Sequence, residues 1–347
     1  MDENPLRLQF RPRAARFPSA APLVLIHDAG GTVYSYLRLG DLKRDVWAIS
    51  DPYFEAVKPW DGGFDEMAEH YQQLIESAGI RGPILLGGWS LGAYVSLAIA
   101  KRMLHMKPCR FYVMGILMVD SPIQIPTSTL PPCGPDPDFS DLPDLVRKSF
   151  DKFDAMLSVC DLPAWDSPAC QGKPVRLAAG GKTFTVETDQ VLHLPLDGGW
   201  MTASLTKTPQ EGRMEVTEQF TGPPPAVLVR CLRRTPTDAP SQGPSQVDRY
   251  RDDLLLGWEG RHQSFIKAVI DVDKHHFNVF QPSNLAIKTQ QDSLGSTVIG
   301  TSPSLTTYQV MELLPQHAAN LLPSLQADTM TQHINEGLNM LDSLQIA

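Results

Sequence analysis

Residues 83–104 read PILLGGWSLGAYVSLAIAKRML and contain three segments of different character. The apolar run from Pro83 to Gly88 is typical of a buried parallel strand. A Gly-x-Ser-x-Gly motif follows at residues 88–92, and the stretch from Leu91 to Leu104 predicts a strongly apolar helix. A serine on a turn between a strand and a helix is held in the position of a nucleophile, so Ser90 is the first candidate catalytic residue.

The two glycines of this motif have a steric role. Because the turn is tight, a side chain at Gly88 or Gly92 would collide with the neighbouring strand and helix. The same geometry places the first N–H groups of the helix beside Ser90, so the Leu91 N–H can stabilise an oxyanion. One turn therefore supplies both a nucleophile and an electrostatic contribution.

The flanking sequence continues the alternation of strands and helices. Between Gly63 and Gly79, apolar residues recur at helical spacing, which predicts one amphipathic helix. Such alternation favours an α/β fold with a mostly parallel sheet and helices on both faces. Besides residues 83–88, the expected strands are 22–27, 46–50, 115–120, 225–232 and 265–272.

A glycine-containing loop follows the first of these strands, in the order His27-Asp28-Ala29-Gly30-Gly31. Small residues allow the backbone to approach a substrate carbonyl, and Ala29 is the best candidate for a second oxyanion-hole N–H. The alternative is that Gly30 and Gly31 only turn the chain. His27 ends the strand too early to be the general base and is expected to pack or to orient the loop.

Two aspartates compete for the acid of a catalytic triad. In α/β-hydrolases the triad follows the chain order Ser, acid, His, with the acid at the carboxyl end of a later strand. Asp120 ends the strand directly after the nucleophile, whereas Asp238 lies in a proline-containing loop after the next strand. We favour Asp120, although a cap or turn role before Ser121-Pro122 would also explain it.

The general base is expected after the last apolar strand. His275 and His276 are adjacent there, where a loop can carry an imidazole over the serine. Position alone does not choose between the two histidines.

The chain is expected to divide into four segments. Residues 1–120 and 223–285 form the two parts of a hydrolase core, residues 121–222 an inserted lid, and residues 286–347 a helical tail. The lid is expected to hold a helix that carries Leu145 to Leu157 and otherwise irregular polar sequence. In the tail we expect helices near Thr306–Leu321 and Thr329–Ile346.

Composition excludes several classes of protein. With 42% hydrophobic residues, the 347-residue chain can bury one sizeable core. No stretch is long and apolar enough to cross a bilayer and the N-terminus lacks a signal pattern, so we expect a cytoplasmic protein. The net charge of −9 argues against nucleic acid and membranes as partners, and the five scattered cysteines suggest neither disulfides nor a metal site.

Residues 25–31, Tyr36 and residues 87–93 resemble the thioesterase domains of polyketide and nonribosomal peptide synthases, and fungal versions most of all. The resemblance extends through Met118–Ser121 and His276-Phe277. It implies that Asp120 is the acid, and that His276 is the base because an aromatic residue follows it. It also implies a free-standing enzyme that acts on an acyl chain that an acyl carrier protein holds on phosphopantetheine. No metal or nucleotide cofactor is expected, and no His/Asp/Glu cluster beyond the triad shows metal-ligand spacing.

Several outcomes stay open after this resemblance. Water could release the chain from Ser90, or an internal group of the substrate could do so by cyclisation. A carboxylesterase that acts on free esters is an alternative, because the fold does not fix the acyl donor. A non-catalytic binding partner of a synthase is a second alternative.

Overall fold

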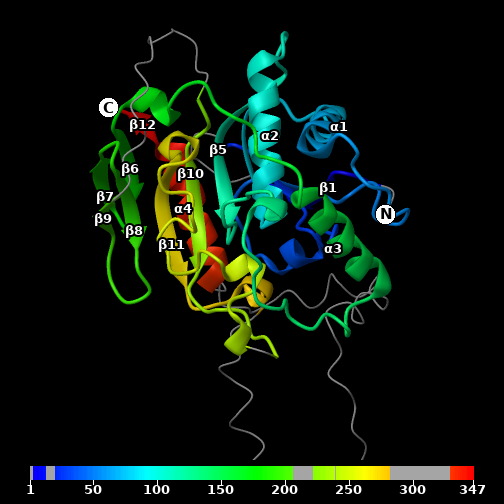
Figure 1. Ribbon diagram of the computed structural model, residues 1–347. Coiled ribbons are helices and arrows are strands. Elements are labelled where there is room, and N and C mark those ends of the chain that lie inside the picture. Colours follow the sequence, from blue (N-terminus) through cyan, green and yellow to red (C-terminus); the bar gives the residue numbers. More distant parts are fainter. Residues whose placement is uncertain (1–2, 13–19, 206–221, 239, 282–328) are drawn as a thin grey trace, which may run out of the picture.

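A computed structural model of the protein describes residues 3–12, 20–205, 222–238, 240–281 and 329–347. Its centre is a nine-stranded sheet in the order β1-β3-β2-β4-β5-β10-β11-β8-β9 (Figure 1). The seven inner strands run parallel, and β1 and β9 are antiparallel at the two edges. The strands are β1 (Leu6–Gln9), β2 (Leu23–Ile26), β3 (Val46–Ile49), β4 (Gly82–Trp89), β5 (Phe111–Val119), β6 (Val175–Ala179), β7 (Lys182–Val186), β8 (Gln190–Leu194), β9 (Met201–Ser204), β10 (Ala226–Cys231), β11 (Ile266–Val272) and β12 (Gln345–Ile346).

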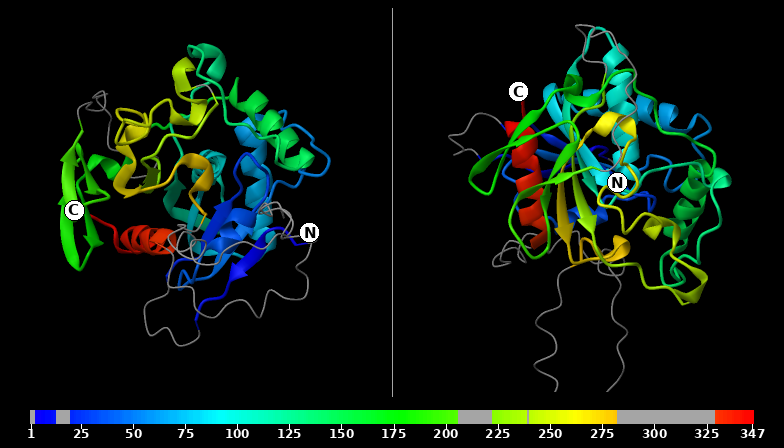
Figure 2. Two further views of the ribbon diagram at one scale, coloured as in Figure 1. Left: turned by 90° about the horizontal axis from the view of Figure 1, so that it is seen from below. Right: turned by 60° about the vertical axis from the view of Figure 1, so that its left-hand side comes forward.

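Helices cover both faces of this sheet. The helices of the described chain are α1 (Gly63–Ser77), α2 (Leu91–His105), α3 (Asp144–Leu157) and α4 (Thr329–Ser343). Helix α2 packs against β2, β4 and β5, whereas α4 lies on the other face against β5, β10 and β11 (Figures 1 and 2). This arrangement confirms the expected α/β-hydrolase architecture.

The inner strands form where the sequence predicted them. All six expected strands are present, as β2, β3, β4, β5, β10 and β11, and every residue of β2, β10 and β11 is buried. Covered on both faces, these strands need apolar side chains at successive positions rather than at alternate ones. Their carboxyl ends meet at one edge of the sheet, and that edge carries Ser90, Asp120 and His276.

The expectation of irregular sequence after the helix at Leu145–Leu157 is wrong for residues 175–204. Strands β8 and β9 extend the central sheet beyond β11, and β6 and β7 form a second sheet with β12. This second sheet lies at the far end of the molecule from α3 (Figure 1). The described part of the segment 121–222 therefore contributes to two separated regions, and a lid role for the part around α3 stays a prediction.

The carboxyl-terminal helix belongs to the core. The expected helix at Thr329–Ile346 is present as α4, which buries Ile334, Leu338 and Leu341 against the sheet. The other expected tail helix, at Thr306–Leu321, lies outside the described residues. In the described part of the chain, none of the helices has the length and apolar character that crossing a membrane requires.

Candidate active site

Ser90 stands on a sharp turn between β4 and α2. Its backbone angles, φ 52° and ψ −115°, lie in a region that residues with side chains rarely adopt. A Cβ atom at Gly88 would lie 2.6 Å from the Ile26 carbonyl oxygen, and one at Gly92 would lie 2.3 Å from the same atom. The steric requirement for both glycines is thus confirmed, and the turn holds Ser90 at the carboxyl edge of the sheet.

Ser90 and Asp120 are neighbours because β4 and β5 pair in parallel register. Trp89 pairs with Val119, and the Ser90 N–H donates to the Val119 carbonyl at 3.1 Å. Asp120 follows directly, and its own N–H donates to Val229 of β10 at 2.8 Å. Two adjacent strand ends thus place the candidate nucleophile beside the candidate acid.

His276 completes the cluster from the loop after β11. Its Nδ1 lies 2.8 Å from Asp120 Oδ2, and the His276 side chain is buried. The ring also packs against Trp89, with 5.4 Å between the ring centroids, so His276 lies next to the residue that precedes Ser90. Within the described residues no hydrogen bond joins the Ser90 hydroxyl to this ring, and such contacts commonly tighten only when substrate binds.

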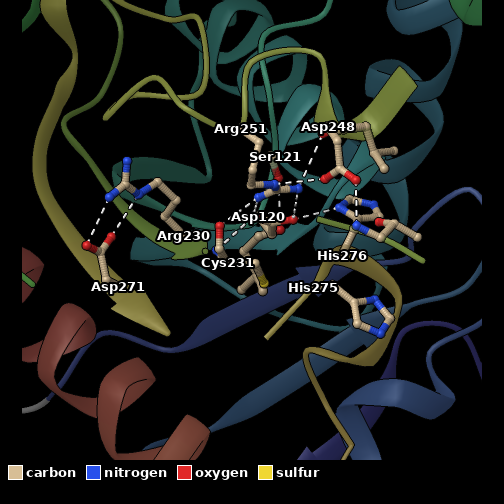
Figure 3. A network of polar contacts seen from close by, with 12 residues as sticks. Asp120, Ser121, Arg230, Cys231, Asp248, Arg251, Asp271, His275 and His276 are labelled. Atoms are coloured by element: carbon tan, nitrogen blue, oxygen red, sulfur yellow. Dashed lines mark hydrogen bonds and ion pairs between the residues drawn. The ribbon is translucent and has the colours of Figure 1, made fainter. Parts of the chain in front are cut away.

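Asp120 is held by more than His276. Arg251 donates to both carboxylate oxygens, from Nη1 at 2.5 Å and from Nη2 at 2.9 Å, and the Cys231 N–H donates to Oδ1 at 2.9 Å (Figure 3). Burial by itself raises the pKa of Asp120, but the His276 hydrogen bond and the Arg251 charge outweigh it and lower the pKa to about 2. Asp120 therefore keeps its negative charge although it is fully buried.

The two rejected candidates lie elsewhere. Asp238 is exposed, and the contact to His276 comes from Asp120. The His275 ring points away from Asp120 (Figure 3). His275 instead caps the short 3₁₀ helix His276–Asn278, where its N–H donates to Asn278 Oδ1 at 2.8 Å.

The loop after β2 approaches the same turn, since the Ile26 and His27 carbonyl oxygens lie against Gly92. Both nitrogens of the buried His27 ring are engaged, Nδ1 with the Asp28 carbonyl at 2.5 Å and Nε2 with the Tyr71 hydroxyl at 2.6 Å. His27 therefore orients the loop, in agreement with the role expected for it. The Leu91 N–H belongs to the first turn of α2, whose N–H groups have no partner within the helix.

Helix α3 fixes the outer side of this loop. The Ser149 hydroxyl donates to the Ala29 carbonyl oxygen at 2.9 Å. Lys152 forms a buried ion pair with Asp51, whose N–H donates to the Gly31 carbonyl at 2.9 Å. The candidate donor Ala29 thus lies on a loop that α3 holds from one side and His27 from the other.

Sequence reasoning missed Arg251, Asp248, Ser149 and Lys152. Asp248 and Arg251 lie three residues apart in chain order, a weak local signal after the proline-containing loop that holds Asp238. Ser149 and Lys152 lie on the helix that was expected as part of the lid. Their contacts join segments far apart in the sequence, so no local pattern indicates them.

The chain is similar in sequence to known thioesterases. Residues 21–123 match the Thioesterase domain family model. A Curvularia clavata protein described as probable thioesterase KK1J is 50% identical over 290 residues, which cover 84% of this chain and 94% of that protein. The nonribosomal peptide synthetase imqB of Aspergillus flavus is 29% identical over 84% of this chain, a match that covers 8% of the synthetase.

Among solved structures, the NocB thioesterase domain from the nocardicin cluster is similar to this chain. The match has 19% sequence identity and a TM-score of 0.44, and it covers 76% of this chain and 87% of that one. The identity to the Curvularia clavata protein over nearly its full length is sufficient to assign the family. This chain belongs to the thioesterase family of α/β-hydrolases.

Proposed function

We propose that this thioesterase acts in secondary metabolism and releases an acyl chain from the phosphopantetheine arm of a carrier protein through an acyl-enzyme on Ser90. The observation that supports it best is the pairing of the strained Ser90 turn with the buried Asp120–His276 contact. These are the parts that acyl transfer to a serine requires.

In the proposed cycle His276 accepts the Ser90 proton as the hydroxyl oxygen attacks the thioester carbonyl. Asp120 holds the ring through Nδ1 and stabilises the imidazolium. The N–H groups of Leu91 and Ala29 bind the oxyanion, and the pantetheine sulfur leaves with the proton from His276. The cycle uses only groups of this chain and requires neither a metal ion nor a nucleotide cofactor.

A second nucleophile then frees the acyl chain from Ser90. Water gives a free acid, whereas a hydroxyl or carbanion of the substrate itself gives a ring. Product mass separates the two outcomes by one water molecule.

An acyl carrier protein is the proposed partner. The match to a small part of a nonribosomal peptide synthetase supports a substrate held on a carrier domain. A free ester would be the alternative acyl donor, because the fold alone does not choose between them. Comparing turnover of an acyl carrier protein, an acyl-pantetheine and a small oxyester separates these donors, and the proposal expects the carrier-bound substrate to give the highest kcat/KM.

The mechanism is tested by intact-protein mass spectrometry after mixing with an acyl-pantetheine thioester. The wild type should gain one acyl group and Ser90→Ala none, because the variant has no hydroxyl to acylate. Ser77→Ala is the matched control, since Ser77 is an exposed serine whose hydroxyl only caps the end of α1. Acylation of Ser90→Ala would refute the assigned nucleophile, and an unmodified, inactive wild type would favour a non-catalytic role at a synthase.

A further inference from the structure

A chain of four side chains begins at His276 and runs through Asp120 and Arg251 to Asp248 (Figure 3). Asp120 contacts His276 with one oxygen, and Arg251 contacts both oxygens of Asp120. Arg251 Nε then donates to Asp248 Oδ1 at 2.8 Å. Four charged or chargeable groups thus alternate in sign when His276 carries a proton.

The far end of this chain is fixed as firmly as the near end. The Thr235 N–H donates to Asp248 Oδ2 at 2.6 Å, and the Ser245 hydroxyl donates to the same oxygen at 3.2 Å. Arg251 also donates from Nη1 to the Cys231 carbonyl at 2.9 Å. The side chains of Asp120, Arg251 and Asp248 are each 1% exposed or less, so water does not screen the charges.

Counting the charges shows what Asp248 contributes. Asp120 and Arg251 alone sum to zero, and such a pair attracts an imidazolium only weakly. With Asp248 the three groups carry a net charge of −1, so the whole cluster becomes neutral when His276 takes a proton from Ser90. Arg251 can therefore anchor Asp120 without cancelling the charge that His276 needs.

We propose that Arg251 and Asp248 are positioning residues of this active site: Arg251 fixes the Asp120 carboxylate against His276, and Asp248 restores the negative charge that Arg251 offsets. This inference rests on the proposed roles of Ser90, Asp120 and His276. Neither residue touches the reacting atoms, and both act through Asp120.

A second cluster in the same protein provides an internal comparison. Arg230 donates to both oxygens of Asp271, and His193 Nε2 lies 2.8 Å from Asp271 Oδ2. The arrangement of arginine, aspartate and histidine is the same, and Arg230 and Asp271 lie apart from the Asp120 cluster (Figure 3). Arg230→Met therefore breaks a buried ion pair of the same type without touching Asp120.

Other charged or titratable groups also surround His276. They come from the strand ends and loops that pack around its own loop: Asp120, Cys231, the exposed pair Arg233 and Asp273, Asp248, Arg251, Lys274 and His275. Of these described groups, Asp248 and Arg251 are the charged side chains that are both buried and connected to His276 through Asp120, whereas Cys231 reaches Asp120 with its backbone N–H.

The test measures two pH dependences for Asp248→Asn and Arg251→Met. One is the acidic limb of kcat/KM, and the other is the titration midpoint of the His276 imidazole, read by NMR in the Ser90→Ala background. Asp248→Asn removes a negative charge and should move both to lower pH, while Arg251→Met removes a positive charge and should move both to higher pH, each by about one unit. In both variants kcat should fall while KM stays unchanged, since neither side chain binds substrate.

Three controls separate this role from a purely structural one. Asp252→Asn removes an exposed carboxylate that pairs with Arg234 in the same loop, and Arg230→Met breaks the comparison cluster; neither should move the midpoints. The double variant Asp248→Asn/Arg251→Met removes one charge of each sign, so its midpoint should lie between those of the single variants. It also keeps the test open if Arg251→Met does not fold.

The proposal is supported if the midpoints of the two single variants shift in opposite directions. If Arg251→Met does not fold, it is supported if the midpoint of Asp248→Asn lies at lower pH than that of the double variant. Unshifted midpoints in folded variants, or shifts in one direction only, would overturn it. The NMR titration uses no substrate, whereas acylation of Ser90 tests the proposed function. Failure of the proposed roles of Arg251 and Asp248 is therefore distinguishable from failure of the proposed function.

Discussion

Two aspartates follow the strands on either side of β4, and their surroundings shift their pKa values in opposite directions. Asp120 follows β5 and Asp28 follows β2, so both stand at the carboxyl ends of buried parallel strands. Burial raises the pKa of Asp28 to about 7, although the N–H groups of Gly30 and of Asp28 itself act to lower it. The pKa of Asp120 is instead lowered to about 2 by the His276 hydrogen bond and the Arg251 charge, which outweigh burial.

The difference shows that a strand end does not set the charge of a carboxyl group, whereas its partners do. Asp120 meets a guanidinium and stays ionised, where it can stabilise an imidazolium. Asp28 accepts hydrogen bonds from the backbone N–H groups of Gly30 and of Asp28 itself, and with a pKa of about 7 it is neutral in a substantial fraction of molecules at pH 7. A neutral group on the loop that carries Ala29 avoids repelling the negative charge that develops on the substrate oxygen.

The largest expected effect is the loss of kcat in Asp120→Asn, which replaces the proposed triad acid. An amide cannot hold the His276 ring in the same tautomer, and kcat should fall by about 10⁴-fold. Steady-state turnover of an acyl-pantetheine measures the loss, and circular dichroism checks that the variant is folded. If turnover fell less than tenfold in a folded variant, Asp120 would not be the acid.

The next largest effect concerns the buried ion pair between Lys152 of α3 and Asp51, which holds the loop that carries Ala29. Lys152→Met leaves the Asp51 carboxylate buried without its cation, which should lower the free energy of unfolding by about 3–5 kcal/mol. The double variant Asp51→Asn/Lys152→Met removes both charges and should lose much less. Urea unfolding at pH 7 compares the two, and equal losses would show that the pair is not electrostatically coupled.

The sequence predicts some parts of the fold and of the candidate site better than others. The inner strands and the Ser90 turn were predictable because burial on both faces and the steric demand for Gly88 and Gly92 leave local signatures. Asp120 was favoured because it ends a strand, whereas His276 was chosen over His275 only through the family resemblance. The triad roles themselves stay predictions until the variants are measured.

The missed parts lack such signatures or have weak ones. Buried and exposed residues alternate along β6, but over the five residues Val175–Ala179 this leaves only a weak sequence signal, and the stretch was expected to be irregular. The contact between Arg251 and Asp120 spans 131 residues of sequence, and no local pattern reports it. Contacts between side chains from loops far apart in the sequence can be identified only once the fold is known.

The contrast between the two aspartates predicts opposite effects of pH on stability. The contribution of Asp28 to the free energy of unfolding is fully present below the unfolded-state pKa of 3.8 and is lost as pH rises through about 7. The contribution of Asp120 is present above pH 3.8 and is lost as pH falls through about 2. Between pH 5 and 8 the wild type should therefore lose roughly 2–3 kcal/mol that Asp28→Asn does not lose. Urea unfolding of both proteins at the two pH values checks this, and parallel losses would contradict a raised pKa for Asp28.

The smallest expected effect concerns the single hydrogen bond by which Ser149 of α3 holds the Ala29 carbonyl. Ser149→Ala removes the donor and should cost about 1 kcal/mol of stability. If Ala29 donates to the oxyanion, kcat should fall up to fivefold with KM unchanged, because about 1 kcal/mol of transition-state binding corresponds to that factor.

Ser158→Ala is the matched control for this variant. Ser158 directly follows the same helix, and its hydroxyl donates to the carbonyl oxygen of Ala155 in α3. A fall in kcat for Ser149→Ala alone would connect α3 to the oxyanion loop. Equal kcat for both variants would restrict α3 to covering the site and leave the placement of Ala29 to His27 and Gly31.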